Sequence, residues 1–473
     1  MSNSSNTGSG SPDTRTIRVG ALARVEGEGA LHLEMRDGRC EQARLDIYEP
    51  PRFFEALLRG RDFREVPDIT ARICGICPVA YQMGSCHALE KALGVFRDVD
   101  PAIRALRNLI YCGEWIESHV LHMFLLHLPD FLGYESAISM VADHGPVVKQ
   151  ALSLKKLGND IVTLVGGRAV HPVNVCVGGF YRAPDPEAAA ALVPQVKQAV
   201  DDMAGLTLFL AEKLTYPKLE RDYEFVALCP EDEYPMNLGR IWSNKGLNVD
   251  QEEFGNAIVE KQVEHSTALH AMIKGRGPYV VGPLARLNLN HEKLHPRAAE
   301  LLPKVCQGVK QELPWRNNFL SLPARALETV HALALAHDIL AGYTPPPRCA
   351  IPLAPRAGSG GHGTEAPRGI CWHHYSTAAD GTILSARIVP PTSQNQSSIE
   401  QDLAALAPTL SALPDEQAAL RCEHLIRNYD PCISCSVHFL KFSRTAVGSA
   451  AGAGREEGSS GGDACAHSAG SVR

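Results

Sequence analysis

The sequence predicts an α+β fold that is predominantly helical, with small N-terminal and peripheral β elements around a helical core. Several long segments place apolar residues at helical spacing, whereas the alternation typical of strands occupies only short stretches. Of the 473 residues, 45% are hydrophobic and 21% are charged, a composition that is ordinary for a chain with a large buried core.

The first expected strands form a hairpin near the N-terminus. Residues 1–15 are rich in Ser, Asn, Gly and Pro and predict a disordered lead. Residues 17–19 and 30–35 then alternate apolar and polar side chains, and Asp37-Gly38 is a turn signal. Between them, Glu26 lies in a glycine-rich bend, where it is either exposed and idle or turned inward to carry protons. The residues alone favour the idle alternative.

Helical periodicity recurs along the rest of the chain. A short helix carries Glu55 and ends at Gly60. The other expected helices span residues 79–93, 102–128, 146–158, 186–214, 254–273, 314–340 and 415–428. Strands are expected within residues 223–247 and at 383–389.

Two Cys-x-x-Cys pairs lie at opposite ends of the chain. Cys74 and Cys77 stand at the entrance of an expected helix, and Cys432 and Cys435 follow the last one. Two thiolates with this spacing can bind one soft metal ion, and two such pairs can provide four sulfur ligands. The amide dipoles at a helix entrance also favour the thiolate form.

Spacing alone favours zinc over a nickel- or iron-type site. Structural zinc sites usually draw their pairs from segments about 15–20 residues apart, however, and here nearly the whole chain intervenes. A thioredoxin-like dithiol would need no second pair. The residues that flank the cysteines therefore decide between these kinds of site.

Those flanking residues resemble a known family. Arg-Ile-Cys-Gly-Ile-Cys at residues 72–77 and Asp-Pro-Cys-Ile-Ser-Cys-Ser-Val-His at residues 430–438 resemble the paired signatures of the nickel-iron hydrogenase large subunit. The resemblance covers roughly residues 16–440 and implies the large-subunit fold and the reversible heterolytic cleavage of H2 to protons and electrons. Residues 16–440 would form the catalytic unit. Residues 441–473 would be a disordered low-complexity tail, removed by a maturation endopeptidase that cuts after His438.

The resemblance also implies the metal ligands. Nickel would be bound by the four cysteines of the two pairs, namely Cys74, Cys77, Cys432 and Cys435. Two of them, Cys77 and Cys435, would also bind an iron that carries carbon monoxide and cyanide. Glu55 and His438 would hold a magnesium ion, which prefers hard oxygen donors.

Three residues would carry the catalysis. Glu26 in Arg-Val-Glu-Gly would accept the proton from the thiolate of Cys432. Arg368 in Glu-Ala-Pro-Arg-Gly would lie over the open face between the metals and contact one cyanide. Thr392, in a Pro-Pro-Thr-Ser segment, would donate a hydrogen bond to the second cyanide.

The chain departs from the family pattern at two positions. Tyr81 stands where the first signature usually ends in histidine, with His87 the nearest histidine. Ser118 stands at a position that is frequently acidic. The Pro-Val-Ala-Tyr continuation at residues 78–81 resembles the cytoplasmic, bidirectional, NAD(P)-linked branch.

Partners are expected because no further cysteine cluster here could hold an iron-sulfur centre. We expect a hetero-oligomer with an iron-sulfur small subunit, flavin and NAD(P) reductase subunits, and nickel chaperones during maturation. No nucleotide-binding motif is present, so cofactor-binding residues of that kind are not expected on this chain. The net charge of −7 gives no reason to expect nucleic acid binding. No apolar run reaches the ~18 residues of a membrane span, and the cytoplasm is the expected compartment.

Two rival functions share some of these features. One is a complex I-type quinone-site subunit homologue, and the other is a structural four-cysteine zinc protein. Retention of all four cysteines argues against the first. Glu26, Glu55, Arg368 and His438 argue against the second, because a closed zinc site has no use for them.

Overall fold

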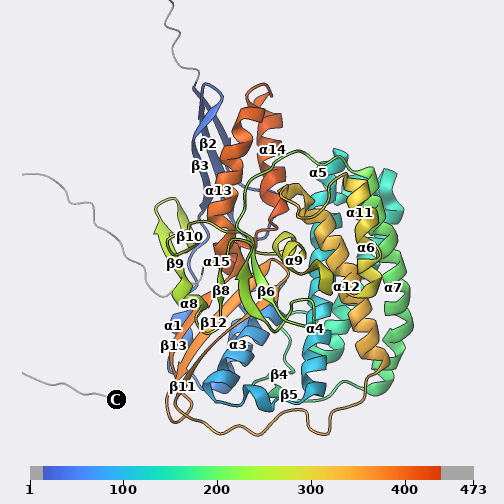
Figure 1. Cartoon of the computed structure of the whole chain (residues 1–473), viewed down its shortest axis with the longest axis vertical. Helices are drawn as coiled ribbons and strands as arrows, with labels where there is room; N and C mark the ends of the chain where they lie inside the picture. Colours follow the sequence, from blue (N-terminus) through green and yellow to red (C-terminus); the bar gives the residue numbers. More distant parts are fainter. Residues whose placement is uncertain (1–13, 438–473) are drawn as a thin grey trace, which may run out of the picture. The chain divides into compact units, whose positions relative to one another are not determined.

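The computed structural model describes residues 14–437 and confirms an α+β fold with a helical core. Four long helices pack side by side as a bundle (Figure 1). They are α4 (Pro101–Val120), α6 (Ala137–Gly166), α7 (Pro186–Lys213) and α12 (Ser321–Ala341). Side-chain caps satisfy backbone N–H groups at three of their starts, from Asp100, Ser136 and Asp185.

Helices α4 and α6 approach closely because each has a glycine at the crossing. A Cβ added at Gly158 would lie 2.7 Å from the backbone nitrogen of Glu117, and one at Gly113 would lie 2.8 Å from Val162 Cγ2. Any larger side chain would push the helices apart. The close crossing therefore fixes the position of α4 against α6, and with it the position of Ser118 on α4.

A three-stranded antiparallel sheet lies beside α3 (Pro78–Ala92). Its strands β11 (Gly358–Ala366), β12 (Gly369–Thr377) and β13 (Ile383–Val389) pair in that order. The glycine-rich start of β11 lies directly on the α3 backbone, since a Cβ at Gly358 would clash with the carbonyl oxygen of Ala92. This contact places the N-terminus of α3 next to the turn between β11 and β12.

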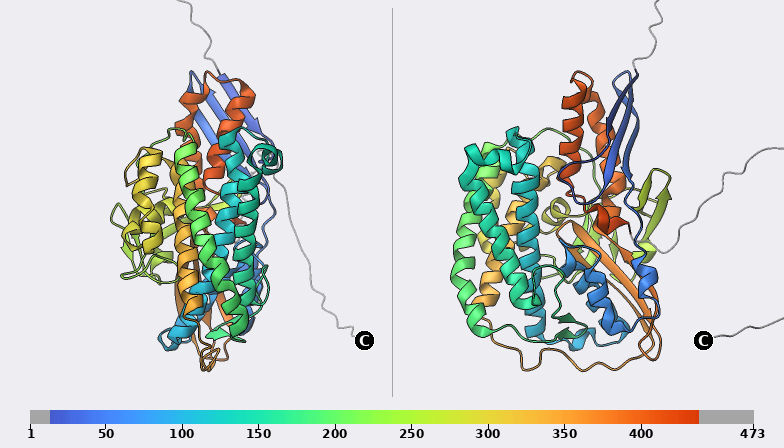
Figure 2. Two further views of the ribbon diagram at one scale, coloured as in Figure 1. Left: turned by 90° about the vertical axis from the view of Figure 1, so that its right-hand side faces the viewer. Right: turned by 180° about the vertical axis from the view of Figure 1, so that it is seen from behind.

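The predicted N-terminal strands belong to a second antiparallel sheet. It consists of β1 (Thr14–Val19), β2 (Gly29–Arg36) and β3 (Arg39–Ile47), paired in that order. Asp37 and Gly38, with φ of 50° and 73°, form the turn from β2 to β3. Helix α13 (Pro391–Leu410) packs on β3, and α14 (Asp415–Asn428) lies beside it (Figure 2).

The predicted helix at residues 254–273 is wrong. Only α8 (Phe254–Ala257) is helical there, and it is followed by a hairpin of β9 (Ile258–Val263) and β10 (Ser266–Ile273). Buried and half-buried residues largely alternate along β10, which packs on α13. Packing on that helix outweighs the local helical pattern.

Short elements connect these layers. The remaining strands are β4 (Val175–Cys176), β5 (Gly179–Phe180), β6 (Val226–Cys229), β7 (Arg240–Ser243) and β8 (Asn248–Val249). The remaining helices are α1 (Phe54–Leu58), α2 (Val66–Ala71), α5 (Leu128–Leu132), α9 (Pro283–Asn290), α10 (Pro296–Ala299), α11 (Leu302–Val309) and α15 (Ile433–Ser436). The single-turn segments are η1 (Phe63–Glu65), η2 (Phe96–Asp98), η4 (His291–Lys293) and η5 (Asn318–Leu320), and a π-helical segment, η3, covers Leu121–His127. Within residues 14–437, no helix is both long enough and apolar enough to cross a membrane.

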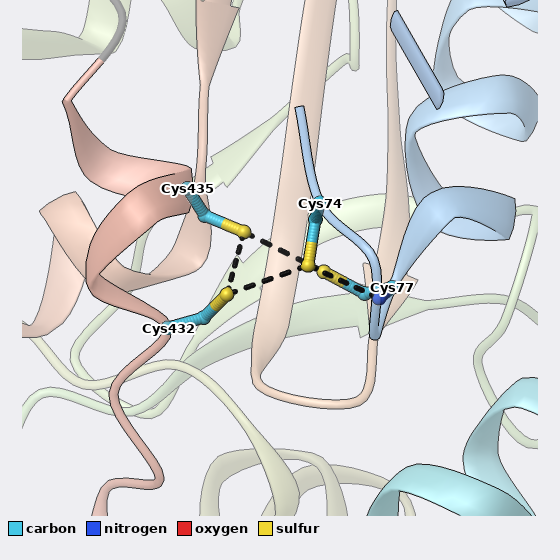
Figure 3. Close-up of side chains that lie close together, drawn as sticks. All are labelled: Cys74, Cys77, Cys432 and Cys435. Atoms are coloured by element: carbon cyan, nitrogen blue, oxygen red, sulfur yellow. Dashed lines mark hydrogen bonds between the residues drawn. The ribbon is translucent and has the colours of Figure 1, made fainter. Parts of the chain in front are cut away.

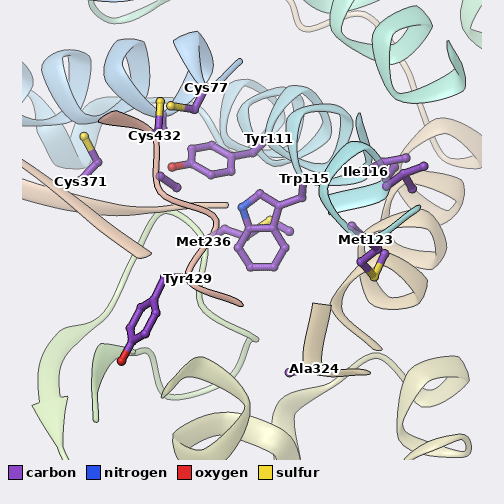
Figure 4. Close-up of a cluster of buried hydrophobic side chains, with 14 of the residues drawn as sticks. Cys77, Tyr111, Trp115, Ile116, Met123, Met236, Ala324, Cys371, Tyr429 and Cys432 are labelled. Carbon is purple, nitrogen blue, oxygen red and sulfur yellow. The ribbon is translucent and has the colours of Figure 1, made fainter. Parts of the chain in front are cut away.

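The four cysteines of the two motifs belong to the hydrophobic core. Figure 4 shows Cys77 and Cys432 in one cluster of buried side chains with Tyr111 and Trp115 of α4. Both cysteines are at least 98% buried. The thiols therefore lie in surroundings of low polarity, where charge interactions are stronger than in water.

Candidate metal centre

The two cysteine pairs meet at one point. The Sγ atoms of Cys74 and Cys432 are 3.4 Å apart, and those of Cys77 and Cys435 are 3.6 Å apart. All four Sγ atoms lie within 4.8 Å of one another (Figure 3). All four cysteines are free and buried. The fold thus joins thiols that are 358 positions apart in the sequence.

Each pair sits at the entrance of a helix. Cys77 is the N-cap of α3, as predicted, and Cys432 is the N-cap of the short α15. In the first pair, the backbone N–H groups of Ile76 and Cys77 donate to Cys74 Sγ at 3.3 and 3.2 Å. Such N–H donors stabilise a thiolate at Cys74.

The four thiols compete for negative charge. Burial opposes ionisation of Cys74, but hydrogen bonds from the other three thiols and the nearby Arg368 guanidinium hold the pKa of its thiol well below the usual value. The pKa of Cys77 is raised well above the usual value by hydrogen bonding to the other thiols and by burial. A second ionisation is therefore costly without a cation between the sulfurs. This donor set fits a soft divalent metal ion.

Glu26 is turned inward toward the second pair. The thiol of Cys432 donates to Glu26 Oε2 at 3.1 Å, and the backbone N–H of Ser434 donates to the same oxygen at 3.1 Å. The backbone N–H of Ile433 donates to the Glu26 carbonyl at 3.0 Å. A carboxylate held this way lies within proton-transfer distance of a thiol.

Gly27 allows this close approach, and its replacement by alanine is expected to lower stability. Its φ is +87°, and an added Cβ would lie 2.6 Å from Ile433 Cβ and 2.7 Å from Glu49 Oε2. A left-handed backbone alone costs a non-glycine residue about 1–2 kcal/mol. Gly60→Ala is the matched control, because Gly60 has φ of +79° and nothing within 4 Å of an added Cβ. We expect Gly27→Ala to lower the unfolding midpoint clearly more than Gly60→Ala. Equal shifts would show that the contact with Ile433 does not matter.

Arg368 lies in the turn between β11 and β12 and is 2% exposed. Its Nε donates to the Asp430 carbonyl at 2.6 Å, Nη2 reaches the Asp430 carboxylate at 3.1 Å, and Nη1 donates to Ser118 Oγ at 3.4 Å. Burial works against its charge, yet Asp430 and the cysteine thiolates raise the pKa of Arg368 well above the usual value. The guanidinium is therefore a fixed cation beside the four sulfurs.

Thr392 is in the first turn of α13. Its Oγ1 accepts the backbone N–H of Cys432 at 3.1 Å. The hydroxyl therefore lies beside the second cysteine pair and keeps its own proton to donate.

Glu55 lies on α1 and is 7% exposed. Its Oε1 accepts the backbone N–H of Ile388 at 2.7 Å. Burial raises the pKa of Glu55 to about 8, with smaller opposing effects from its hydrogen bond and from Arg387. A buried carboxylate fits a hard divalent cation. The second predicted magnesium ligand, His438, lies outside the described residues.

The two departures from the family pattern fall at different places. The hydroxyl of Tyr81 donates to the Cys435 carbonyl at 3.5 Å, so this residue contacts the second pair. The ring of Tyr81 also packs edge-on against His373, with the ring centroids 5.7 Å apart. His87 instead pairs with His362, the ring nitrogens being 3.1 Å apart. Ser118 offers Arg368 only its hydroxyl oxygen.

Arg286 supports the turn that carries Arg368, and no sequence pattern predicts this role. This arginine is fully buried and donates to Glu328 at 2.7 Å and to Glu365 at 3.0 Å. It also donates to the carbonyls of Ala366 and Pro367, and its guanidinium lies 4.4 Å from the ring centroid of Trp115. An arginine inside an ordinary helical pattern carries no motif that could reveal such partners.

Replacing Glu328 with glutamine is expected to destabilise the chain by about 3–5 kcal/mol, because Arg286 would lose one of its two buried carboxylate partners and keep only Glu365. Although burial opposes ionisation, Arg286 and His119 lower the pKa of Glu328 to about 2. Since this value is below that of the unfolded chain, the stabilisation is present above about pH 4.5 and is lost as the pH falls through about 2.

Chemical denaturation at neutral and acidic pH measures this effect. The difference between wild type and Glu328→Gln should be largest near neutral pH and should shrink below about pH 4.5. Glu300→Gln, a surface change at the end of α10, is the control. A difference that does not depend on pH would contradict the assignment of charge to Glu328.

Known proteins match this chain over most of its length. The family model for nickel-dependent hydrogenases matches residues 52–153 and 274–438. The chain is 35% identical to the sulfhydrogenase 2 subunit alpha of Pyrococcus furiosus, over 90% of this chain and 99% of that protein. It is 26% identical to the NAD-reducing hydrogenase HoxS subunit beta of Cupriavidus necator, over 90% of this chain and 95% of that protein.

Solved structures show the same fold. A crystal structure of an NAD+-reducing [NiFe]-hydrogenase in the H2-reduced state superposes with a TM-score of 0.80 at 23% identity, covering 90% of this chain and 99% of that chain. The reduced Ni-Fe-Se hydrogenase of Desulfovibrio vulgaris Hildenborough gives a TM-score of 0.73 at 24% identity, covering 90% of this chain and 100% of that chain.

Proposed function

The chain belongs to the nickel-dependent hydrogenase family as a catalytic large subunit, and from this premise we propose that its four clustered cysteines hold a nickel-iron centre that cleaves H2 reversibly. The observation that carries the proposal is the meeting of four free, buried thiols within 4.8 Å. Both cysteine pairs contribute, and Glu26 faces one of the sulfurs.

The resemblance to the family suggests which residues would hold each metal. Soft thiolates suit nickel, so Cys74, Cys77, Cys432 and Cys435 would all bind it. Two of them, Cys77 and Cys435, would also hold an iron with carbon monoxide and cyanide ligands. When bound, this centre supplies the binding and heterolytic splitting of H2.

Glu26 is the residue proposed to take protons away. Its Oε2 is 3.1 Å from Cys432 Sγ, so a proton can pass from the thiol to the carboxylate without a large movement. The N–H of Ser434 holds that oxygen in place. Cys432 is accordingly the sulfur proposed to carry the proton first.

Arg368 and Thr392 are proposed to contact the cyanide ligands. Arg368 is a fixed cation held by Asp430, and Thr392 has a hydroxyl proton to donate next to Cys432. Fixed charges and donors around an anionic centre stabilise it without reorganisation.

Magnesium is proposed to bind Glu55 together with His438. The buried carboxylate of Glu55 supports the first half of this assignment. Residues 16–440 would form the catalytic unit, and an endopeptidase would remove the tail after His438 during maturation, which also involves nickel chaperones.

The electron route is proposed to run through partner subunits. An iron-sulfur small subunit would take the electrons, and flavin-containing reductase subunits would pass them to NAD(P) in the cytoplasm. The support is the pair of relatives named a sulfhydrogenase and an NAD-reducing hydrogenase.

The complex purified from its native host tests this function. With H2 as the only reductant, it should reduce a viologen dye and also NAD+ or NADP+. Reduction of the dye alone would remove the nucleotide link but keep the hydrogenase. If a nickel-loaded complex reduced neither acceptor, the proposed function would be wrong.

A further inference from the structure

Arg52 joins the two cysteine motifs through backbone carbonyls. Its Nη2 donates to the carbonyl of Ile73 at 2.9 Å and also to the carbonyl of Ser434. Ile73 directly precedes Cys74, and Ser434 directly precedes Cys435. One guanidinium nitrogen therefore bonds both to the residue that precedes Cys74 and to the residue that precedes Cys435.

The backbone of the same residue adds a third link. The N–H of Arg52 donates to the carbonyl of Val437 at 2.9 Å. The arginine is also fixed on its own side, where its Cζ lies 5.5 Å from the ring centroid of Phe54. Phe53, between them, has φ of 52°, so the chain turns sharply just after the arginine.

Among residues 14–437, few other polar contacts link the two motifs directly. The sulfur atoms meet one another, and Tyr81 adds a hydrogen bond of 3.5 Å to the Cys435 carbonyl. Glu26 and Thr392, by contrast, bond to the second motif. The charged donor on Arg52 is stronger than a neutral hydrogen bond, and it is half-buried.

We propose that Arg52 is a positioning residue, a clasp that sets the spacing between the two cysteine pairs before and after metal binding. The inference rests on the proposed four-cysteine centre. Small displacements of ligands change metal affinity, and loss of a group that orients them typically costs about 10–100-fold. Arg52 touches neither metal nor substrate, and its effect passes through the carbonyls of Ile73 and Ser434.

Cobalt binding to the full chain prepared without nickel tests the clasp directly. Co2+ bound by thiolates absorbs visible light, and the intensity reports how many sulfurs bind. We expect Arg52→Gln to weaken Co2+ binding about 10–100-fold, with Arg52→Lys in between because it keeps the charge but lacks the planar, fixed donor geometry of the guanidinium. Cys74→Ser calibrates the loss of one sulfur.

Arg64→Gln is the matched control for this titration. Arg64 lies in the same segment, is exposed, and bonds to Asp62 and the ring of Phe63 rather than to a cysteine motif. This variant should bind Co2+ like wild type. If Arg52→Gln also bound Co2+ with unchanged affinity and absorption, the proposal would be overturned.

Infrared spectra of the assembled complex give a second test. The carbon monoxide and cyanide bands of Arg52→Gln should be displaced or doubled relative to wild type and Arg64→Gln, which a general loss of stability would not produce. Coincident bands at full metal content would also overturn the proposal. Should wild type itself lack these bands, the nickel-iron proposal fails, while the cobalt titration still decides the role of Arg52.

Discussion

Cys435→Ser is expected to abolish assembly of the bimetallic centre, and with it H2-dependent activity. The Sγ of Cys435 is 3.6 Å from that of Cys77 and 2.8 Å from that of Cys432, so it lies at the junction of both pairs. A serine hydroxyl is a hard donor that stays protonated near neutral pH, so it cannot replace a thiolate between two metals. Metal analysis of the purified chain and an H2-uptake assay measure the outcome.

Cys112→Ser provides the matched control for this loss. Cys112 is also fully buried, but it lies on α4 outside the four-cysteine cluster, and burial alone raises the pKa of its thiol. It should keep its metals and activity if it folds. If Cys435→Ser retained nickel, iron and native activity, Cys435 would have to be removed from the ligand set.

Glu26→Gln is expected to keep the metals and slow H2 oxidation by about 10²–10⁴-fold, the range typical for loss of a positioned general base. The amide oxygen of glutamine can still accept the Ser434 N–H, so the loop should keep its shape. The amide cannot take a proton from Cys432. Exchange between H2 and D+ in the solvent measures that transfer apart from electron flow.

Glu28→Gln is the control for Glu26, because it makes the same change at an exposed position of the same loop. It should leave exchange unchanged. Unchanged H2/D+ exchange in a fully metallated Glu26→Gln variant would contradict the role of Glu26 as proton acceptor.

Where local pattern and packing agree, the sequence predicts the fold well. Helix α14 and strand β13 have the predicted bounds, because their apolar residues follow the period of the element that forms. Residues 254–273 show the limit of this reasoning. Their spacing allows a helix, but α13 offers a surface on which a hairpin packs, and this contact is invisible in the local sequence.

Some residues of the candidate site are likewise predictable from the sequence, and others are not. The local Cys-x-x-Cys-Pro pattern predicts that Cys77 lies at the entrance of a helix, as it does. No local pattern predicts the roles of Arg52 and Arg286, since their partners are carbonyls and carboxylates brought together only by folding. Long-range hydrogen bonds of a single arginine leave no periodic trace in the chain.

Infrared spectroscopy of the complex from its native host tests the central claim most directly. A nickel-iron centre held by the four cysteines predicts bands from metal-bound carbon monoxide and cyanide, and these bands should shift when H2 is added. Their absence from a folded, metal-loaded complex would contradict the nickel-iron centre and return the four thiols to the zinc interpretation.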